Sequence, residues 1–155
     1  MWAEFVRVVD TPIGKIGLYS NGTQISGLEF RTRENRRDEL PVLLQAEREL
    51  QEYFAGRRRE FSVPLCMHGT DFQKSVWQIV AEIPYGETAT YKDIAVKLGM
   101  EKSCRAVGMA NNRNPLPIFI PCHRVIGTGG SLKGYAGGVA AKQFLLELEG
   151  NDVKI

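Results

Sequence analysis

A cysteine followed directly by a histidine is the part of this sequence best suited to covalent chemistry. Cys122 and His123 come just after the apolar run Ile118–Ile120, in a chain with 3 cysteines and 2 histidines. A cysteine is a useful nucleophile when a nearby group stabilises its thiolate and its surroundings exclude water. Neighbouring side chains on a strand point to opposite faces, however, and free cysteine often serves as a small buried apolar residue. The pair alone therefore leaves a catalytic and a structural cysteine both open.

Length and composition limit the class of protein. With 155 residues and 43% hydrophobic content, the chain can form one domain or two small ones. No apolar run approaches the ~18 residues of a membrane span, and the N-terminus lacks the features of a secretory signal. Cys66, Cys104 and Cys122 are odd in number and widely spaced, which argues against a disulfide framework or a zinc cluster. We expect a cytoplasmic protein with no membrane partner and no metal.

Positive charge is concentrated in one segment. Residues 1–70 hold ten basic and ten acidic side chains, whereas between residues 91 and 142 only Asp93 and Glu101 oppose eight basic ones. The local balance of 8 − 2 gives +6. Such a stripe suits a polyanion such as nucleic acid, although a solvated basic face is the alternative. The basic residues are Lys92, Lys97, Lys102, Arg105, Arg113, Arg124, Lys133 and Lys142.

The N-terminal part reads as strands followed by a helix. Runs rich in β-branched and aromatic residues predict strands at Phe5–Val9, Lys15–Ser20, Gln24–Phe30 and Phe61–Leu65. Asn21-Gly22 is typical of a two-residue hairpin. After Pro41, apolar residues at helical spacing predict a helix that ends near Gly56, with Leu43, Ala46, Leu50 and Phe54 facing inward. We expect an α/β domain over residues 1–67, with a small antiparallel sheet and one helix.

The second part is richer in helices. Thr70 and Thr90 are predicted to cap two helices, the second ending at Gly99, and Ser103 a third that runs from Cys104 to about Arg113. Two short helices joined by a tight turn with glycine have the form of a helix-turn-helix. Such pairs also occur without DNA, but the basic stripe falls on these same elements.

The segments around Cys122 complete this domain, expected over residues 71–150. A strand at Ile118–Ile120 is predicted to deliver the cysteine, and the glycine-rich run 127–134 to form a wing or a flexible loop. A last helix from about Gly138 to Glu149 should turn Phe144, Leu145 and Leu148 inward. The fold class is thus an α/β N-terminal domain followed by a mostly helical, winged helix-turn-helix-like C-terminal domain.

Six blocks of this sequence resemble the O6-alkylguanine-DNA alkyltransferases, also called methylated-DNA–protein-cysteine methyltransferases. The resemblance is specific from about Phe72 to Glu149 and loose in the N-terminal half. The blocks stand in the family's order and spacing: Ile83-Pro84-Tyr85-Gly86-Glu87, Thr90-Tyr91, Arg105-Ala106-Val107-Gly108, Asn114-Pro115-x-Pro117, Ile120-Pro121-Cys122-His123-Arg124-Val125-Ile126 and Gly134-Tyr135-x-Gly137-Gly138.

The resemblance implies a reaction and its partners. An alkyl group would pass directly and irreversibly from guanine O6, and from thymine O4, in DNA to the sulfur of Cys122, once per molecule and without a cofactor. The partner would be double-stranded DNA carrying the lesion, bound through the minor groove by a monomer. Such a cytoplasmic protein would associate with the nucleoid when bound to DNA.

The resemblance also implies catalytic roles. Cys122 would be the nucleophile, and Glu149, His123 and a bridging water would form the relay that removes its proton, a triad-like arrangement. Tyr91 would donate a hydrogen bond to the leaving base and crowd the adjacent phosphate. A base inside a duplex is inaccessible to a thiol, so the nucleotide must be rotated out of the stack.

DNA-binding and pocket residues follow from the same matches. Arg105 would enter the space left by the flipped base from the start of the recognition helix. Further DNA-binding residues are expected at Tyr91, Thr90, Ser103, Asn111, Arg113 and Arg124. Asn111 replaces a methionine found in the pocket of some relatives. The lesion pocket would be closed by the backbone of Val125, by Tyr135 and by the backbone N–H of Ala136, with Asn114 bracing the loops or serving only as a helix C-cap.

Three other functions remain as alternatives. A non-catalytic lesion binder would carry tryptophan where this chain has Cys122. A cysteine hydrolase would take its base from a distant segment, and the only other histidine, His68, lies in an exposed-looking connector. An ordinary helix-turn-helix regulator would leave the run from Cys122 to Arg124 unexplained. The sequence favours the alkyltransferase over all three.

Overall fold

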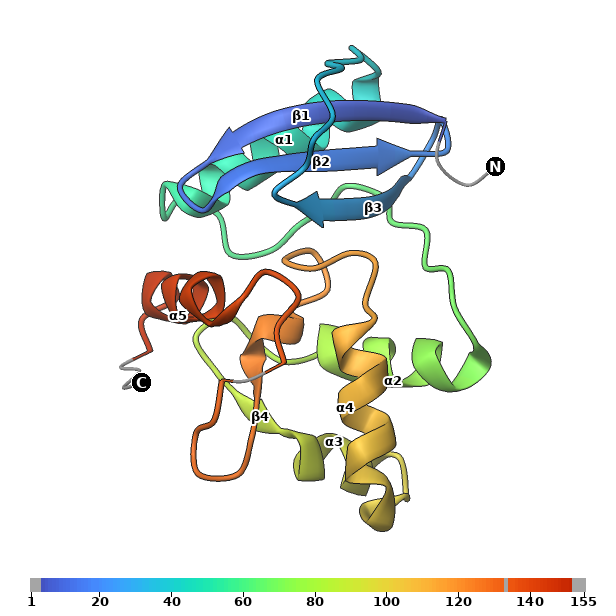
Figure 1. Ribbon diagram of the computed structural model, residues 1–155, viewed down its shortest axis with the longest axis vertical. Helices are drawn as coiled ribbons and strands as arrows, with labels where there is room; N and C mark the ends of the chain where they lie inside the picture. The colour runs from blue at the N-terminus through green and yellow to red at the C-terminus, as the bar shows by residue number, and fades with distance from the viewer. Residues whose placement is uncertain (1–3, 133, 152–155) are drawn as a thin grey trace. The chain divides into compact units, whose positions relative to one another are not determined.

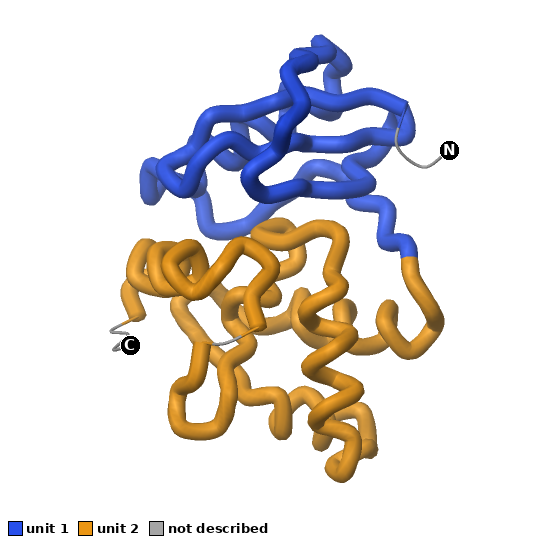
Figure 2. Tube along the Cα trace, viewed as in Figure 1, with its two compact units in different colours: residues 1–68 blue, residues 69–155 orange. Residues whose placement is uncertain are grey.

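The chain divides into two compact units, residues 1–68 and 69–155 (Figure 2). The computed structural model describes residues 4–132 and 134–151. Lys133, which we counted in the basic stripe and in the glycine-rich run, and residues 1–3 at the N-terminus lie outside the described part. No helix in the described part has the length and apolar character needed to cross a bilayer.

Unit 1 is a small antiparallel sheet packed on one helix (Figure 1). The sheet has the order β1 (Phe5–Thr11), β2 (Gly14–Ser20) and β3 (Ile25–Phe30), and α1 (Pro41–Phe54) contacts all three strands. The inward residues predicted for α1 are buried at Leu43, Ala46 and Leu50, whereas Phe54 is half-buried. The α/β fold predicted for this half is confirmed.

The connection from β2 to β3 is longer than we predicted. It comprises residues 21–24, not two residues. Asn21 closes it with its side chain, because its Oδ1 accepts the backbone N–H of Thr23 at 3.1 Å and of Gln24 at 2.9 Å. The side chain thus takes the part that the backbone would play in a tighter turn.

The strand predicted at Phe61–Leu65 is wrong. Only an isolated bridge between Ile25 and Leu65 forms there. The backbone N–H groups of Ser62 and Val63 donate instead to the buried carboxylate of Glu49, at 2.8 and 3.2 Å. These donors are used by a side chain from α1 and do not join a sheet ladder, so the segment stays irregular.

Unit 2 holds four α-helices in its described part: α2 (Asp71–Ala81), α3 (Tyr91–Lys97), α4 (Cys104–Asn112) and α5 (Val139–Leu148). Thr70 and Thr90 cap α2 and α3 as predicted, each in a capping box with the residue three positions later. The side chain of Ser103 makes no cap hydrogen bond. A 3₁₀ turn, η1 (Glu101–Ser103), leads into α4 in its place.

The segment that carries Cys122 is a turn and a short helix, not the strand predicted at Ile118–Ile120. Cys122 begins the 3₁₀ helix η2 (Cys122–Arg124), followed by β5 (Val125–Ile126), which pairs in parallel with β4 (Ala89–Thr90). Ile118 has a positive φ of 75°, a strained conformation for a β-branched residue. Pro117 and Pro121 flank the turn and cannot donate to a sheet ladder, which explains the missing strand.

The described part of the glycine-rich run is a loop, one of the two forms predicted, in which Gly127 N–H donates to Ser131 O at 2.8 Å. The last helix differs from the prediction in detail. In α5, Leu145 is buried as predicted, but Phe144 is exposed and Leu148 only half-buried. The inward face includes the charged Lys142, which a hydropathy pattern assigns to the outside.

Candidate active site

Cys122 is almost fully buried, and hydrogen bonds hold the backbone on its N-terminal side. Its backbone N–H donates to the carbonyl of Ile120 at 2.7 Å, across Pro121 in an inverse γ-turn conformation (φ −77°, ψ 62°). The side-chain amide of Asn114 holds the segment that leads to Cys122. Its Nδ2 donates to Ile120 O at 2.9 Å, and its Oδ1 accepts Leu116 N–H at 2.9 Å. Asn114 therefore braces the loop through its side chain, one residue beyond the C-cap of α4 at Arg113.

The surroundings of Cys122 favour a protonated thiol. Burial raises the pKa of this thiol to about 11, and a hydrogen bond from Asn114 and the positive charge of Lys142 only partly oppose that effect. At neutral pH the sulfur therefore rests as S–H, which is a weak nucleophile. Any reaction at this sulfur needs a base that removes the proton.

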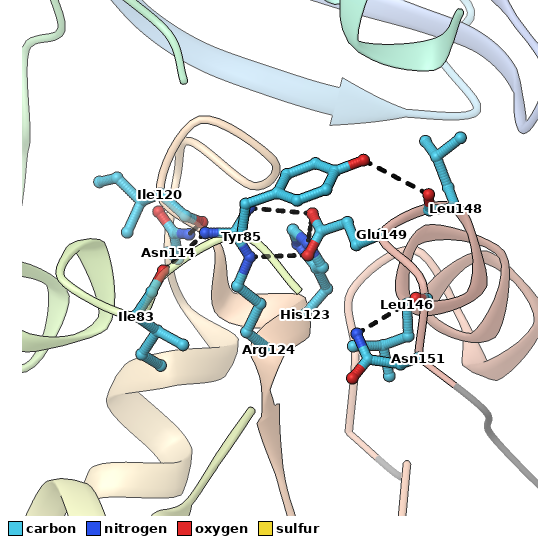
Figure 3. A network of polar contacts seen from close by, with 10 residues as sticks. All are labelled: Ile83, Tyr85, Asn114, Ile120, His123, Arg124, Leu146, Leu148, Glu149 and Asn151. Carbon is cyan, nitrogen blue, oxygen red and sulfur yellow. Dashed lines mark hydrogen bonds and ion pairs between the residues drawn. The ribbon is translucent and has the colours of Figure 1, made fainter. Parts of the chain in front are cut away.

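His123, the residue that follows Cys122 in the chain, forms a buried pair with Glu149. Nε2 of His123 lies 2.8 Å from Oε2 of Glu149, and neither side chain is exposed to solvent (Figure 3). His123 Nδ1 is also buried and finds no hydrogen-bond partner within the described part of the chain. Since a neutral imidazole has one donor and one acceptor nitrogen, Nε2 would donate to the carboxylate and leave Nδ1 as the acceptor.

Arg124 does not lie on a DNA-binding surface, contrary to our prediction. Its side chain is buried and its guanidinium is engaged on both edges (Figure 3). Nε and Nη2 donate to the two oxygens of Glu149 at 2.8 and 3.0 Å, and Nη1 donates to Ile83 O at 2.6 Å. This bidentate geometry fixes the Glu149 carboxylate and leaves Arg124 unable to reach a phosphate.

Tyr91 lies close enough to Cys122 for the two groups to interact electrostatically. It is the first residue of α3, and a Cβ placed on Gly108 of α4 would lie 3.7 Å from its ring, so the two helices approach closely there. Burial raises the pKa of Tyr91, negative charge on Cys122 raises it further, and a hydrogen bond from Asn111 acts in the opposite direction. The phenol is therefore a protonated donor close to the sulfur.

Asn111 also belongs to the interior. It is 2% exposed, and its Nδ2 points to the carbonyl of Cys122 at 3.4 Å. Our prediction of a DNA contact at this residue is not supported, because α4 turns it toward Tyr91 and Cys122 and away from solvent.

The predicted pocket residues are mostly buried around the same segment. Val125 and Tyr135 are buried, whereas Ala136 is exposed. The sequence did not single out Lys142 as a site residue, yet it is 1% exposed and donates through Nζ to Val125 O at 2.5 Å. Lys142 lies seven residues before Glu149 and so shares its helical face. That spacing is the one feature of the sequence that could have indicated Lys142 as a site residue.

The expected DNA-binding face lies on α3 and α4. Arg105 in the first turn of α4 and Arg113 at its C-cap are exposed, and none of the ion pairs within residues 4–132 and 134–151 involves either. Thr90 and Ser103 are half-buried, and the hydroxyl of Thr90 is already used as a helix cap. Positive charge on this face thus comes from a few exposed arginine and lysine side chains.

Comparison with known proteins gives the same family for both units. Residues 71–151 match the "6-O-methylguanine DNA methyltransferase, DNA binding domain" and residues 5–67 match its "ribonuclease-like domain". A methylated-DNA–protein-cysteine methyltransferase of Methanosarcina barkeri is 48% identical, over 97% of this chain and 99% of that protein. The constitutive enzyme of Bacillus subtilis is 45% identical, over 94% of each chain. The crystal structure of Mycobacterium tuberculosis OGT in complex with DNA is similar at a TM-score of 0.84, with 44% identity, over 93% of this chain and 91% of that one.

Proposed function

Because the chain belongs to the 6-O-methylguanine DNA methyltransferase family, we propose that it repairs DNA by moving an alkyl group from O6 of guanine to Cys122. Repair of DNA by alkyl transfer to a protein cysteine is the activity of this family and of this chain. The proposal adds which cysteine accepts the group, which base atom gives it up, thymine O4 as a second donor atom, and a single turnover per molecule.

The contact between His123 and Glu149 is the observation that supports Cys122 as the cysteine that accepts the alkyl group. Cys66 faces His68, with Sγ 3.3 Å from Nε2, but that thiol is only half-buried. Cys104 lies at the start of α4, where its Sγ donates to a backbone carbonyl at 3.5 Å. Of the three cysteines, all of them in the described part, Cys122 is the buried one, and it lies next to a histidine–carboxylate pair. A buried thiol with its own base is what nucleophilic attack requires.

The reaction can be written with its protons and electrons balanced. The thiol proton of Cys122 passes through a water to Nδ1 of His123, while Nε2–H donates to Glu149. The sulfur attacks the alkyl carbon, the C–O6 bond breaks, and its electron pair goes to the guanine. The phenol of Tyr91 donates a hydrogen bond to the base as negative charge develops there. The guanine anion then takes up a proton from water, and the His123 imidazolium returns its extra proton to water, so that protons and charge balance. The product is a thioether that no group in the site can cleave, so each molecule reacts once.

The DNA partner is proposed to bind through α3 and α4. Arg105 is exposed in the first turn of α4 and is the charged side chain best placed to fill the space left by a flipped base. If Arg105 is inserted through the minor groove from the end of α4, the rest of that helix would lie against the sugar-phosphate backbone of the DNA. A monomer suffices, because all the residues of the proposed site come from unit 2 of one chain.

The test is intact-mass measurement after exposure to a duplex that carries O6-methylguanine. One methyl group should appear on the peptide that contains Cys122, and no more than one per molecule at saturating DNA. Cys122→Ala should take up no methyl group and still bind DNA, whereas Cys66→Ser and Cys104→Ser should react like the wild type. Methylation of the Cys122→Ala variant would assign the reaction to another residue.

A further inference from the structure

Glu149 serves two buried partners at once. Its Oε2 lies 2.8 Å from His123 Nε2 and 3.0 Å from Arg124 Nη2, and its Oε1 takes the Nε–H of Arg124 at 2.8 Å (Figure 3). A carboxylate that faced only the histidine would favour the imidazolium form of that ring. With the guanidinium on its other edge, the Glu149 charge is already balanced.

The turn from Ile83 to Gly86 covers this ion pair. Ile83 O accepts Arg124 Nη1 at 2.6 Å, and the Tyr85 ring lies 5.7 Å from the guanidinium carbon. The Tyr85 hydroxyl donates to Leu148 O at 3.3 Å, which ties the turn to the end of α5. Gly86 has a φ of 83°, and a Cβ there would approach Glu149 O to 3.3 Å. Ile83 and Tyr85 therefore contribute contacts that hold Arg124 or the end of α5, and the glycine at position 86 lets the turn lie close to the backbone of Glu149.

The charges that face His123 come from two elements. Burial lowers the pKa of His123; Glu149, at the C-cap of α5, acts in the opposite direction, and the charges of Arg124 in η2 and Lys142 in α5 lower it further. Cys122 precedes it in η2 and is a neutral thiol at rest, while Tyr91 of α3 faces that thiol. The result is a neutral imidazole, although a carboxylate contacts it directly.

We propose that Arg124 is a positioning residue for alkyl transfer, which neutralises and orients Glu149 so that His123 rests protonated only on Nε2 and accepts the thiol proton at Nδ1. Without Arg124, the carboxylate would hold a proton on both nitrogens of the ring, and Nδ1 would be a donor and no longer a base. The inference rests on the proposed function for its catalytic meaning, but the state of His123 can be measured without any DNA.

The direct measurement is the pH titration of the His123 ring nitrogens by ¹⁵N NMR. In the wild type, His123 should show a proton only on Nε2 at pH 6. In Arg124→Met, the titration midpoint should rise by about one pH unit or more, because an uncompensated carboxylate at contact distance changes a pKa by about 1–3. Reaction with free O6-benzylguanine should then lose rate mainly on the acid side, by up to about tenfold at pH 6 when the pKa of His123 rises by one.

Three further variants separate this role from simple packing. Arg124→Lys keeps the positive charge and should keep His123 neutral. Tyr85→Phe removes the hydroxyl bond to Leu148 but no charge, and should leave the titration unchanged. The double variant Arg124→Met/Glu149→Gln carries neither charge and should return the midpoint to a low value, which shows that Arg124 acts through Glu149.

The outcomes are distinct. If folded Arg124→Met gives the same His123 titration as the wild type, the role assigned to Arg124 is wrong. Should Arg124→Met not fold, Arg124→Gln, which also lacks the positive charge, is titrated in its place and is judged in the same way. If wild-type Cys122 takes up no methyl group while the titrations behave as expected, the proposed function fails and the electrostatic role of Arg124 stands.

Discussion

The indole Nε1 of Trp77 donates to the backbone carbonyl of Ala110 at 2.8 Å, within the interior of unit 2. Trp77 belongs to α2 and is 1% exposed, and Ala110 lies in the last turn of α4. The next residue, Asn111, points its amide to the carbonyl of Cys122. One buried hydrogen bond thus fixes the helix that carries both Arg105 and a neighbour of the nucleophile.

Trp77→Phe should destabilise unit 2. The change removes the donor and leaves the Ala110 carbonyl buried without its partner, which costs about 1–3 kcal/mol, and the smaller ring adds a packing loss. Urea denaturation followed by circular dichroism measures the difference. Gln78→Ala, at the next and exposed position of α2, is the matched control and should change stability little. Equal stability of Trp77→Phe and the wild type would contradict the importance of this bond.

Tyr91→Phe should slow transfer without weakening DNA binding. The phenylalanine ring keeps the close approach to Gly108, where a Cβ would lie 3.7 Å from the ring, so α3 and α4 should stay in place. The lost hydroxyl removes a hydrogen bond to a base that gains negative charge, and such bonds are worth about 1.5–3 kcal/mol, or about 10–100-fold in rate. Single-turnover kinetics on a lesion-bearing duplex give the rate, and fluorescence anisotropy gives the affinity. An unchanged rate would exclude Tyr91 as the donor.

Arg105→Ala should affect duplex repair more than reaction with a free base. A free base needs no flipping, so O6-benzylguanine should react within about twofold of the wild-type rate, whereas the duplex reaction should fall by about tenfold or more, since extrusion of a base costs a few kcal/mol. Arg113→Ala is the matched control on the same helix: it should weaken DNA affinity in a salt-dependent way and spare flipping. Similar losses on both substrates would argue against Arg105 as the flipping residue.

Local features of the fold could be predicted from the sequence, and long-range polar contacts could not. Thr70 and Thr90 are predicted as caps because threonine is a common N-cap before an apolar helical run, and in the structure each hydrogen-bonds with the residue three positions later. Arg124, Lys142 and Glu49 were assigned to the surface or not considered, because charged residues are rarely buried without a partner. The partner of Arg124 is 25 residues away, and no pattern of spacing reveals such a pair.

In the candidate site, too, the sequence reveals residues that are neighbours in the chain but not those that meet only in the fold. Cys122 and His123 stand out by adjacency, whereas Glu149 came only from the family resemblance. The strand expected at Ile118–Ile120 failed because Asn114, Pro117 and Pro121 impose a turn whose geometry depends on a side chain bonded to Ile120. Asn111 was expected on the DNA surface and is buried, since helical spacing alone does not tell which face of a short helix meets its neighbour.

Glu49 should make unit 1 sensitive to acid. Its carboxylate is buried and accepts hydrogen bonds from Ser62, Val63 and Gln45. Burial alone would raise the pKa of Glu49, but the hydrogen bonds from Gln45, Ser62 and Val63 outweigh it and lower the pKa below the ordinary value of 4.5. The unfolded chain therefore binds a proton at Glu49 before the folded chain does, and the stability of unit 1 rises with pH through this range. The contribution is complete above pH 4.5 and is lost as the pH falls through the lower pKa of the folded state.

Glu49→Gln should lower the melting temperature near neutral pH, at a cost of about 2–4 kcal/mol, because a neutral amide cannot accept all of these bonds. The difference from the wild type should shrink as the pH is lowered below 4.5. Glu52→Gln, which removes a partly exposed ion-pair partner of Arg58 on the same helix, should show no such pH dependence, since surface pairs contribute little. Melting curves for the three proteins between about pH 3 and 7 measure this directly, across the range in which carboxylates titrate. If the difference in melting temperature between the wild type and Glu49→Gln stayed constant over that range, the carboxylate charge would not be what holds the segment after α1.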